Sequence, residues 1–249
     1  ATVATRFPRI SDYAGTGPTE EQYKRVTIPL IRGGIYFKNN WIDLTSMVSY
    51  ISKSNNIDQQ NLTNPGTSES KTVLLIYNIH TLGWTTSAEI DPFKGFHLHA
   101  LFTWQKPQYS NYSASVTFNN GNTMSVNADK MIVKEIPQIL IELDPSYQIT
   151  KDVRAWMSFR YFGKTYANLQ EAFYFNGHWE TFGGINWQVN KHLSLGADVV
   201  NIFNVSGAKG TINGTELVTK EDAKKYAGYI MSGSYLRPFT VEFSASLKF

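Results

Sequence analysis

The sequence predicts an all-β protein, built as a segment of an antiparallel transmembrane β-barrel. Apolar and polar residues alternate with a period of two along most of the 249 residues, several alternating segments exceed ten residues, and short and long connections follow each other in turn. Successive side chains of a strand point to opposite faces, so each segment has one apolar and one polar face. Crossing an apolar band of about 25 Å at a tilt of about 40° takes about 10 residues, whereas globular strands average about 5–6.

Nine segments alternate in this way, and the clearest is the C-terminal Pro238–Phe249. An odd number does not suit a single-chain bacterial barrel, and nine strands enclose little space. We therefore expect further strands beside these nine. The tip of one of them, a tenth strand, is expected at Ala1–Thr5. The other eight segments are Ile31–Lys38, Trp41–Ser52, Leu82–Ile90, Phe96–Gln105, Gln138–Tyr147, Val153–Tyr161, Trp179–Val189 and Leu193–Val199.

The connections between the predicted strands alternate between short turns and long loops. Short turns at one end and long loops at the other are the layout of outer-membrane barrels, with the short turns in the periplasm. A helical pattern is expected only in the last loop, as one or two turns at Lys220–Tyr226. The tight turns are Lys38–Asn40, Asp91–Gly95, Thr150–Asp152 and Asn190–Lys191, and the long polar loops are Asn55–Lys71, Lys106–Glu135, Gly163–Gly177 and Asn204–Arg237.

Composition narrows the class of protein. A hydrophobic fraction of 42% excludes a disordered chain, and the lack of cysteine excludes disulfides, thiolate metal sites and a cysteine nucleophile. A net charge of +3 without a basic run does not indicate nucleic acid as a partner. No apolar run is long enough for a transmembrane helix.

No arrangement of residues indicates an enzyme. The chain shows no catalytic triad, no phosphate-binding loop after a strand and no paired carboxylates in a recognisable motif. We therefore predict no catalytic residue and no cofactor. An outer-membrane protease or lipase is the enzymatic alternative.

Aromatic residues gather near the ends of the predicted strands. Such rings favour membrane–water boundaries and form girdles there, although aromatics also favour strands in general. Agreement with strand length and loop sorting favours the girdle. The residues concerned are Trp41, Tyr50, Trp84, Phe93, Trp104, Tyr147, Tyr161, Trp179 and Trp187.

Several stretches carry a resemblance to a known family. Among the most specific are the ending of the penultimate strand, Asp198–Asn204 (DVVNIFN), and the terminal Arg237–Phe249 (RPFTVEFSASLKF). Thr5–Gly15 (TRFPRISDYAG), Ile90–Leu98 (IDPFKGFHL) and Arg160–Asn168 (RYFGKTYAN) extend the similarity. Through these stretches the chain resembles TonB-dependent outer-membrane receptors, especially those of Bacteroidetes.

The resemblance implies the C-terminal part of a 22-stranded barrel over residues 1–249, without the plug domain and the TonB box. Receptors of this family import siderophores, haem, cobalamin, glycans or peptides across the outer membrane of Gram-negative bacteria. The implied partners are outer-membrane lipid, the remaining barrel strands, the plug, TonB through the missing N-terminal part and, in some lineages, a surface lipoprotein lid. The terminal Phe249 matches the aromatic residue that the barrel-assembly machinery reads.

Candidate substrate-binding residues lie on the polar strand faces and in the loops. His97, His99 and Arg160 would line the substrate path, or else a lattice of ion pairs that holds the plug. Tyr109 and Tyr112 would contact ligand from a long loop, with Asn111, Asn119, Asn120 and Asn122 beside them, or be ordinary loop residues. Arg9 would meet an anionic ligand at the barrel mouth, or pair with loop carboxylates.

The spacing of His97 and His99 places two imidazoles on one strand face, an arrangement that can bind zinc or copper. No third ligand follows nearby, and zinc sites use three or four protein ligands. The sequence therefore predicts no metal.

Two further functions stay open. One is a complete small outer-membrane barrel with a structural or adhesive role. The other is a soluble all-β carbohydrate-binding module, in which two stacked sheets would enclose the apolar faces.

Overall fold

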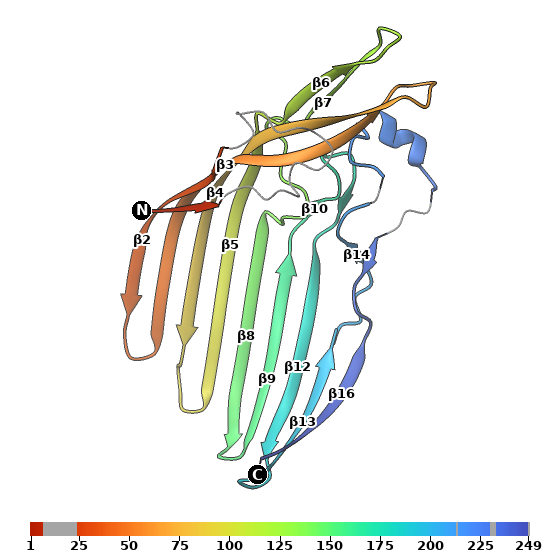
Figure 1. The fold of residues 1–249 in the computed structure, drawn as a ribbon. Helices are drawn as coiled ribbons and strands as arrows, with labels where there is room; N and C mark the ends of the chain where they lie inside the picture. The colour runs from red at the N-terminus through yellow and green to blue at the C-terminus, as the bar shows by residue number, and fades with distance from the viewer. Residues whose placement is uncertain (7–23, 213, 230–232, 249) are drawn as a thin grey trace.

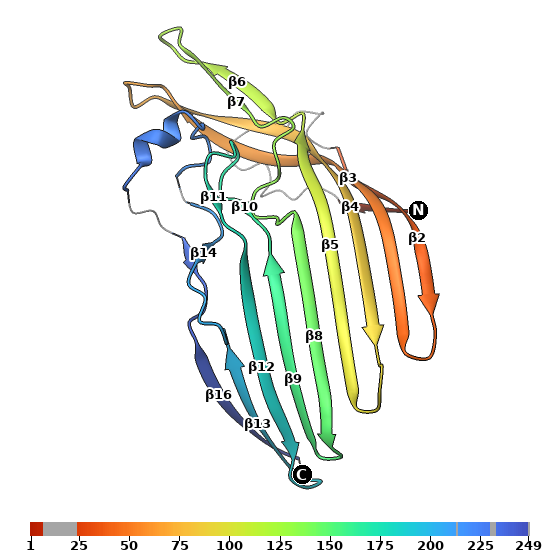
Figure 2. The ribbon, with the colours of Figure 1, turned by 180° about the vertical axis from the view of Figure 1, so that it is seen from behind.

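The computed structural model describes residues 1–6, 24–212, 214–229 and 233–248. Most of them form one antiparallel sheet of ten strands, which appears in Figures 1 and 2 as a single curved wall. The predicted all-β, antiparallel fold is confirmed. Across the sheet the strands are β1 (Thr2–Arg6), β2 (Val26–Lys38), β3 (Ile42–Thr63), β4 (Ser70–Ile90), β5 (Phe96–Ser110), β8 (Ile139–Thr150), β9 (Val153–Phe162), β12 (His178–Gln188), β13 (Leu193–Val200) and β16 (Thr240–Leu247).

The expected tenth strand is present, because β1 pairs with β2 from Thr2 opposite Leu30 to Arg6 opposite Val26. Among the described residues, β1 and β16 are the two edges of the sheet and do not pair with each other. No helix in the described part of the chain is long and apolar enough to cross a membrane.

One face of the sheet is apolar and bare. Rows of apolar side chains run across neighbouring strands: Trp84 lies opposite Trp104, which lies opposite Ile139. Trp84 is 45% exposed and Phe243 is 82% exposed, although both belong to the regular sheet. Within the described residues the stacked sheets of a soluble module are not seen.

Aromatic residues mark two levels on this face. Trp179 and Trp187 both lie on the apolar side of β12, and both are more than one-third exposed. Eight residues correspond to about 26 Å along a strand, or about 20 Å of height at a tilt of about 40°. This separation is comparable to the apolar band of about 25 Å that outer-membrane barrels present to lipid.

The opposite face carries charged and polar side chains. Glu142 of β8 lies opposite Arg160 of β9, which lies opposite Glu180 of β12. His99 of β5 lies between Glu89 of β4 and Asp144 of β8 in the same way. Charges are therefore concentrated on one face, as the period of two predicts.

The four tight turns lie together at one end of the sheet, seen at the bottom of Figure 1. In the turn before β5 the Phe96 amide donates to the Phe93 carbonyl at 3.2 Å, and the Gly95 carbonyl accepts the Gln148 amide of the neighbouring β8 at 2.7 Å. Gly95 has a φ of 89°, a conformation that glycine adopts without the steric cost other residues incur. The predicted turns are confirmed.

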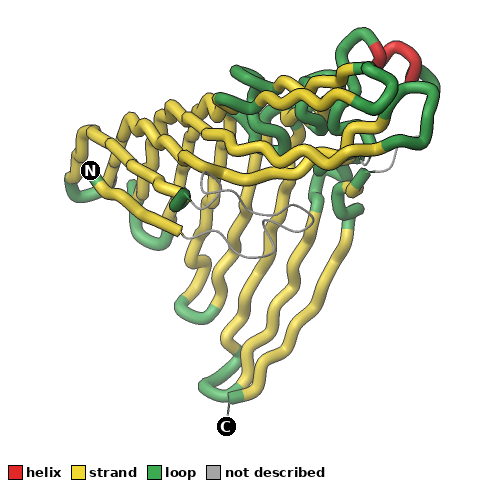
Figure 3. The backbone as a smooth tube through the Cα atoms, turned by 45° about the horizontal axis from the view of Figure 1, so that its top comes forward, coloured by secondary structure: helices red, strands yellow, loops and turns green. Residues whose placement is uncertain are grey.

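The prediction of a loop at Asn55–Lys71 is wrong. Strand β3 continues to Thr63 and β4 begins at Ser70, so the pairing runs from Asn56 opposite Tyr77 to the end of the hairpin. The register shifts between Lys53 and Asn56, where Asn55 has a φ of 59°. Beyond this bulge the two strands bend across the end of the sheet (Figures 1 and 3), and we call residues 55–78 the arm.

The other three long connections also contain regular structure. The loop predicted at Lys106–Glu135 includes the end of β5 and a hairpin of β6 (Ser113–Thr117) and β7 (Thr123–Asn127). The next holds the short pair β10 (Thr165–Tyr166) and β11 (Tyr174–Phe175). The last holds β14 (Ala208–Lys209), β15 (Ser234–Tyr235) and the 3-10 helix η3 (Asp222–Tyr226), which confirms the predicted helical turn.

The hydrophobic core lies in these connections rather than in the wall. We call the arm together with the described residues of 106–138, 163–177 and 201–239 the cap. Leu62 and Leu75 of the arm pack against the end of β5, the β6–β7 hairpin and the loop after β9. The buried core residues are Leu62, Leu75, Tyr109, Tyr112, Phe118, Val126, Ala128, Val133 and Leu169.

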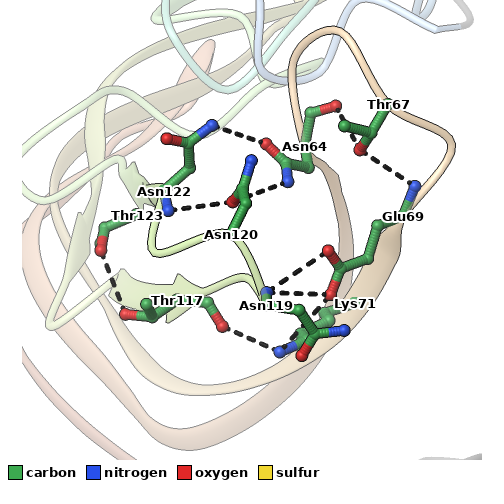
Figure 4. Close-up of polar contacts among 9 residues, drawn as sticks. All are labelled: Asn64, Thr67, Glu69, Lys71, Thr117, Asn119, Asn120, Asn122 and Thr123. Carbon is green, nitrogen blue, oxygen red and sulfur yellow. Dashed lines mark hydrogen bonds and ion pairs between the residues drawn. The ribbon is translucent and has the colours of Figure 1, made fainter.

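Polar contacts join the tips of the two cap hairpins (Figure 4). Asn64, which is 1% exposed, donates to the Asn120 side chain at 3.1 Å and accepts from the Asn122 side chain at 3.1 Å. The Lys71 ammonium donates to the Thr117 carbonyl at 2.8 Å. The tips are therefore held to each other and do not act as independent loops.

Replacing Asn64 with alanine should loosen this junction. The change leaves the amides of Asn120 and Asn122 without their buried partner, at a cost of about 1–3 kcal/mol. We expect amide hydrogen exchange at the two tips of the full-length protein to become about fivefold faster or more.

Asn119→Ala is the matched control, because Asn119 contacts Glu69 only through its backbone amide. Equal exchange rates in the Asn64→Ala variant and in this control would contradict the assigned role of Asn64.

Candidate functional site

A hollow of about 1080 Å³ lies inside the cap. Ligand pockets usually measure about 300–1,000 Å³, so this hollow suits a bulky ligand. Its wall joins the arm to segments far along the chain, including the loop after β13 and η3. Residues that represent these elements are Asp58, Tyr77, Lys134, Glu216 and Tyr226.

Three tyrosines form the aromatic side of this hollow. The ring centroids of Tyr77 and Tyr112 lie 4.8 Å apart, those of Tyr109 and Tyr112 5.1 Å apart, and those of Tyr77 and Tyr109 5.7 Å apart. These tilted and edge-to-face arrangements are the favoured ones for aromatic pairs. The trio links the arm to the end of β5.

A carboxylate network adjoins the tyrosines. The Asp58 carboxylate accepts hydrogen bonds from the Tyr112 hydroxyl, from the Gln60 side-chain amide at 2.9 Å and from the Gln59 backbone amide at 2.9 Å. Gln60 also donates to the Tyr112 hydroxyl at 3.2 Å. Asp58 therefore holds both neighbouring side chains in place at the wall of the hollow.

Burial keeps these phenols protonated. Desolvation raises the pKa of Tyr77 to about 12, with the nearby Asp58 charge as the second cause. Desolvation likewise raises the pKa of Tyr109 and of Tyr112, and the hydrogen bond to Asp58 adds to the effect on Tyr112. The cap hollow is thus lined by neutral hydroxyls that can donate or accept hydrogen bonds.

Ion pairs complete the wall. Lys134 lies 3.8 Å from Glu216, and Lys225 of η3 lies 2.7 Å from Asp222. Charges of both signs, amides and aromatic faces therefore meet in one hollow. This mixture is suited to a polar or chelated ligand rather than to a lipid chain.

Sequence reasoning identified Tyr109 and Tyr112 but placed them in a surface loop. The structure buries them, with 5% and 1% of their surface exposed, in β5 and directly after it. Asn120 and Asn122 bond to Asn64, and the Asn111 backbone amide donates to the Asp129 carboxylate at 2.8 Å. The substrate-binding role of the two tyrosines stays a prediction.

His97, His99 and Arg160 meet at a second hollow, of about 420 Å³, on the polar face near the tight turns. His97 Nδ1 lies 2.9 Å from Asp91, and His99 Nδ1 lies 2.6 Å from Glu89. Arg160 Nε lies 3.8 Å from Glu142. These contacts join neighbouring strands on the polar face, and both the substrate-binding role and the lattice that holds the plug stay predictions.

Two of the predicted residues cannot be placed. Arg9 and Phe249 both lie outside the described residues. Their roles as an anion contact and as a barrel-assembly signal stay predictions.

Sequence reasoning missed two sets of residues. Asp58 and Tyr77 lie in or beside the stretch predicted as a loop, so the partners across the arm were not apparent. Glu142 and Asp144 were not among the predicted site residues, yet the β5–β8 pairing brings both beside His99. The alternating carboxylates on β8 could have been noticed in the sequence. The register between β5 and β8 could not, because a long connection separates the two strands.

No family model matches the sequence, and no curated protein shows significant similarity to it. Solved structures do match. The ferric-catecholate import receptor Fiu of Escherichia coli K12 matches 99% of this chain with a TM-score of 0.62 and 15% identity, over 32% of its own length.

Two further receptors give the same result. The siderophore receptor PiuA of Acinetobacter baumannii matches 98% of this chain and 32% of its own, with a TM-score of 0.65 and 12% identity. The pyoverdine outer-membrane receptor FpvA of Pseudomonas aeruginosa matches 99% and 33%, with a TM-score of 0.61 and 16% identity. All three are TonB-dependent outer-membrane receptors. The chain has the fold of a TonB-dependent receptor barrel.

The likeness covers nearly the whole chain but only about one third of each receptor, with 32% for Fiu and 33% for FpvA. Residues 1–249 therefore correspond to a portion of such a barrel. The receptor activity, its cargo and its partners are subjects for proposal.

Titration should reveal the protonated tyrosine of the arm. At pH values below 10.0, the ordinary pKa of tyrosine, burial of the neutral Tyr77 makes its full contribution to the stability of the cap. This contribution is lost as the pH rises through about 12, the raised pKa of Tyr77. We expect absorbance at 295 nm to show a late phenol transition that Tyr77→Phe reduces by one tyrosine. Loss of amplitude from a transition near pH 10 instead would show that Tyr77 is solvated.

Proposed function

We propose that the chain is the C-terminal portion of the barrel of a TonB-dependent receptor, which imports a scarce nutrient across the outer membrane of a Gram-negative bacterium. The bare apolar face of a single sheet carries the proposal, because in water such a face would have to be covered by protein. The receptor structures that share the fold support it.

The tight turns define the periplasmic end and the cap the outer end of the barrel. The polar face then lines the lumen, where it would meet the plug domain and the route of the substrate. Strands beyond β1 and β16 close the barrel, since closed pairing is the way in which strands satisfy their backbone groups in lipid.

The cap hollow is the place where cargo is first bound. Its volume of about 1080 Å³ and its mixed wall suit a siderophore, haem, cobalamin, glycan or peptide. Tyr109 and Tyr112 act from the wall, while His97, His99 and Arg160 border the route lower in the lumen. TonB would supply energy through the N-terminal part, and a surface lipoprotein is the proposed lid at the outer end.

The two alternatives fit less well. A soluble carbohydrate-binding module would bury apolar residues such as Phe243, which is 82% exposed. A complete small barrel would pair its first and last strands, whereas the described β1 and β16 lie at opposite edges. The solved structures that share the fold are receptors rather than enzymes, which supports a receptor over the enzymatic alternative.

A growth experiment tests the transport function. Strains with and without the gene are compared on limiting ferric siderophore, haem, cobalamin, glycan or peptide. We expect growth on one of these nutrients to depend on the gene, and to depend on TonB as well. Growth that depends on the gene but not on TonB would reject active import by this receptor.

Adjacent residues on β12 test the membrane orientation. Ile185 lies on the apolar face and Asn186 on the polar face, so lysine at each position gives a matched pair. We expect Ile185→Lys to destabilise the full-length protein in bilayers by about 1–3 kcal/mol, given about 2–4 kcal/mol at the midplane and less near the interface.

Asn186→Lys should stay close to the wild type in the same denaturant titration. Equal destabilisation by the two lysines, or a larger effect at Asn186, would contradict the assignment of the Ile185 face to lipid and would reject the barrel orientation.

A further inference from the structure

A compact set of metal-ligating groups lies on the polar face, and two of its members, His99 and Asp144, line the hollow near the tight turns. One possible ligand atom from each of His99, Glu142 and Asp144 lies within 4.8 Å of the other two. All three side chains are partly buried, and among the described residues this is the only such group. The hollow beside them measures about 420 Å³.

Strand register builds this trio. His99 of β5 lies directly opposite Asp144 of β8, and Glu142 lies opposite Leu101, two residues further along β5. Residues two apart on a strand share a face, and diagonal neighbours on adjacent strands are within reach of long side chains. The sheet thus presents one imidazole and two carboxylates to the same space.

Unpaired polar atoms face the same hollow. Ser158 lines it and is 6% exposed, yet its hydroxyl has no hydrogen-bond partner, and Asp144 Oδ1 is also buried without one. Buried polar atoms in native proteins nearly always have a partner. A group that the protein chain does not supply would satisfy them.

The contact of His99 with Glu89 has the geometry that metal sites use. His99 Nδ1 lies 2.6 Å from Glu89 Oε1, so Nε2 is the nitrogen left for another ligand. A metal-binding histidine usually donates its other ring N–H to a carboxylate, which fixes the ring and raises its basicity. Glu89 is in that position.

The charge balance also favours a cation. The carboxylates of Glu89, Asp91, Glu142 and Asp144 surround this region. Arg160 lies 3.8 Å from Glu142, and Arg154 donates to the Ser146 hydroxyl at 2.9 Å. The four carboxylates outnumber the two guanidinium groups, and this excess of acidic groups favours a cation between them.

We propose that His99, Glu142 and Asp144 bind one divalent transition-metal ion, with Zn²⁺ as the best-suited ion, on the lumen wall. Imidazole and carboxylate are zinc ligands, and three protein ligands with water in the fourth position form a stable zinc coordination. Glu89 orients His99, and Ser158 lies against the site. The site joins β5 to β8 whatever the cargo of the receptor is.

The test uses the purified full-length receptor, stripped with chelator and titrated with ZnCl₂ by calorimetry and by metal analysis after dialysis. We expect His99→Ala and Asp144→Asn each to weaken Zn²⁺ binding tenfold or more and to remove one bound ion. Heat-modifiable migration on gels verifies that each variant is folded. Co²⁺ in the wild type should give the visible spectrum of a mixed nitrogen and oxygen site.

His97→Ala is the matched control, since His97 shares the strand and the face but lies outside the trio, bonded to Asp91 and 3.2 Å from Glu89. Its affinity should stay within about threefold of the wild type. Equal losses for His97→Ala and His99→Ala would assign any metal to the histidine pair instead. Unchanged Zn²⁺ binding in all variants would place the ion elsewhere in the protein, and a wild type that binds no Zn²⁺ would overturn the proposed site.

Discussion

An apolar sheet face with no protein over it is the constraint on which the rest of the molecule depends. Side chains such as Trp84 and Ile185 are about half exposed in a regular sheet. Only a hydrocarbon phase accommodates such a face at little cost, and that phase demands complete backbone pairing within it. The strands are therefore long and continuous, their charges gather on the other face, and their irregular connections lie beyond the ends. A soluble protein would have its hydrophobic core between layers. Here the core lies in the cap, which is outside the apolar band and is surrounded by water.

The wall could be predicted from the sequence because lipid on one side and polar surroundings on the other impose a strict period of two. Segments such as Leu193–Val199 and Val153–Tyr161 lie within a residue or two of β13 and β9. The arm was not predictable in the same way. Its first strand is rich in Asn and Gln, a composition typical of loops, and its second strand contains the continuous apolar run Val73–Tyr77, which does not alternate. Outside the membrane both faces of a hairpin can be polar, so the period fades although the pairing from Asn56 to Thr63 is regular.

The sites show the same division. The tyrosines were recognised as notable, but their burial depends on the arm folding over β5, which local sequence does not reveal. His99 and Asp144 are 45 positions apart and become neighbours only through the β5–β8 register. That register follows from the connection between the strands, which contains a hairpin of its own. Residue type therefore indicated candidates, while long-range pairing decided which of them meet.

The register shift at Asn55 bears on how such a protein tolerates insertions and deletions. Below the shift, each pair of β3 and β4 is fixed by the face that must meet hydrocarbon. Above it, the ladder continues to Thr63 opposite Ser70 with its own alignment. Lengthening both arm strands by two residues would keep Leu62 and Leu75 on the same side, whereas adding one would turn them outward. Evolution can thus remodel the outermost part of the hairpin in steps of two while the membrane-embedded portion stays as it is.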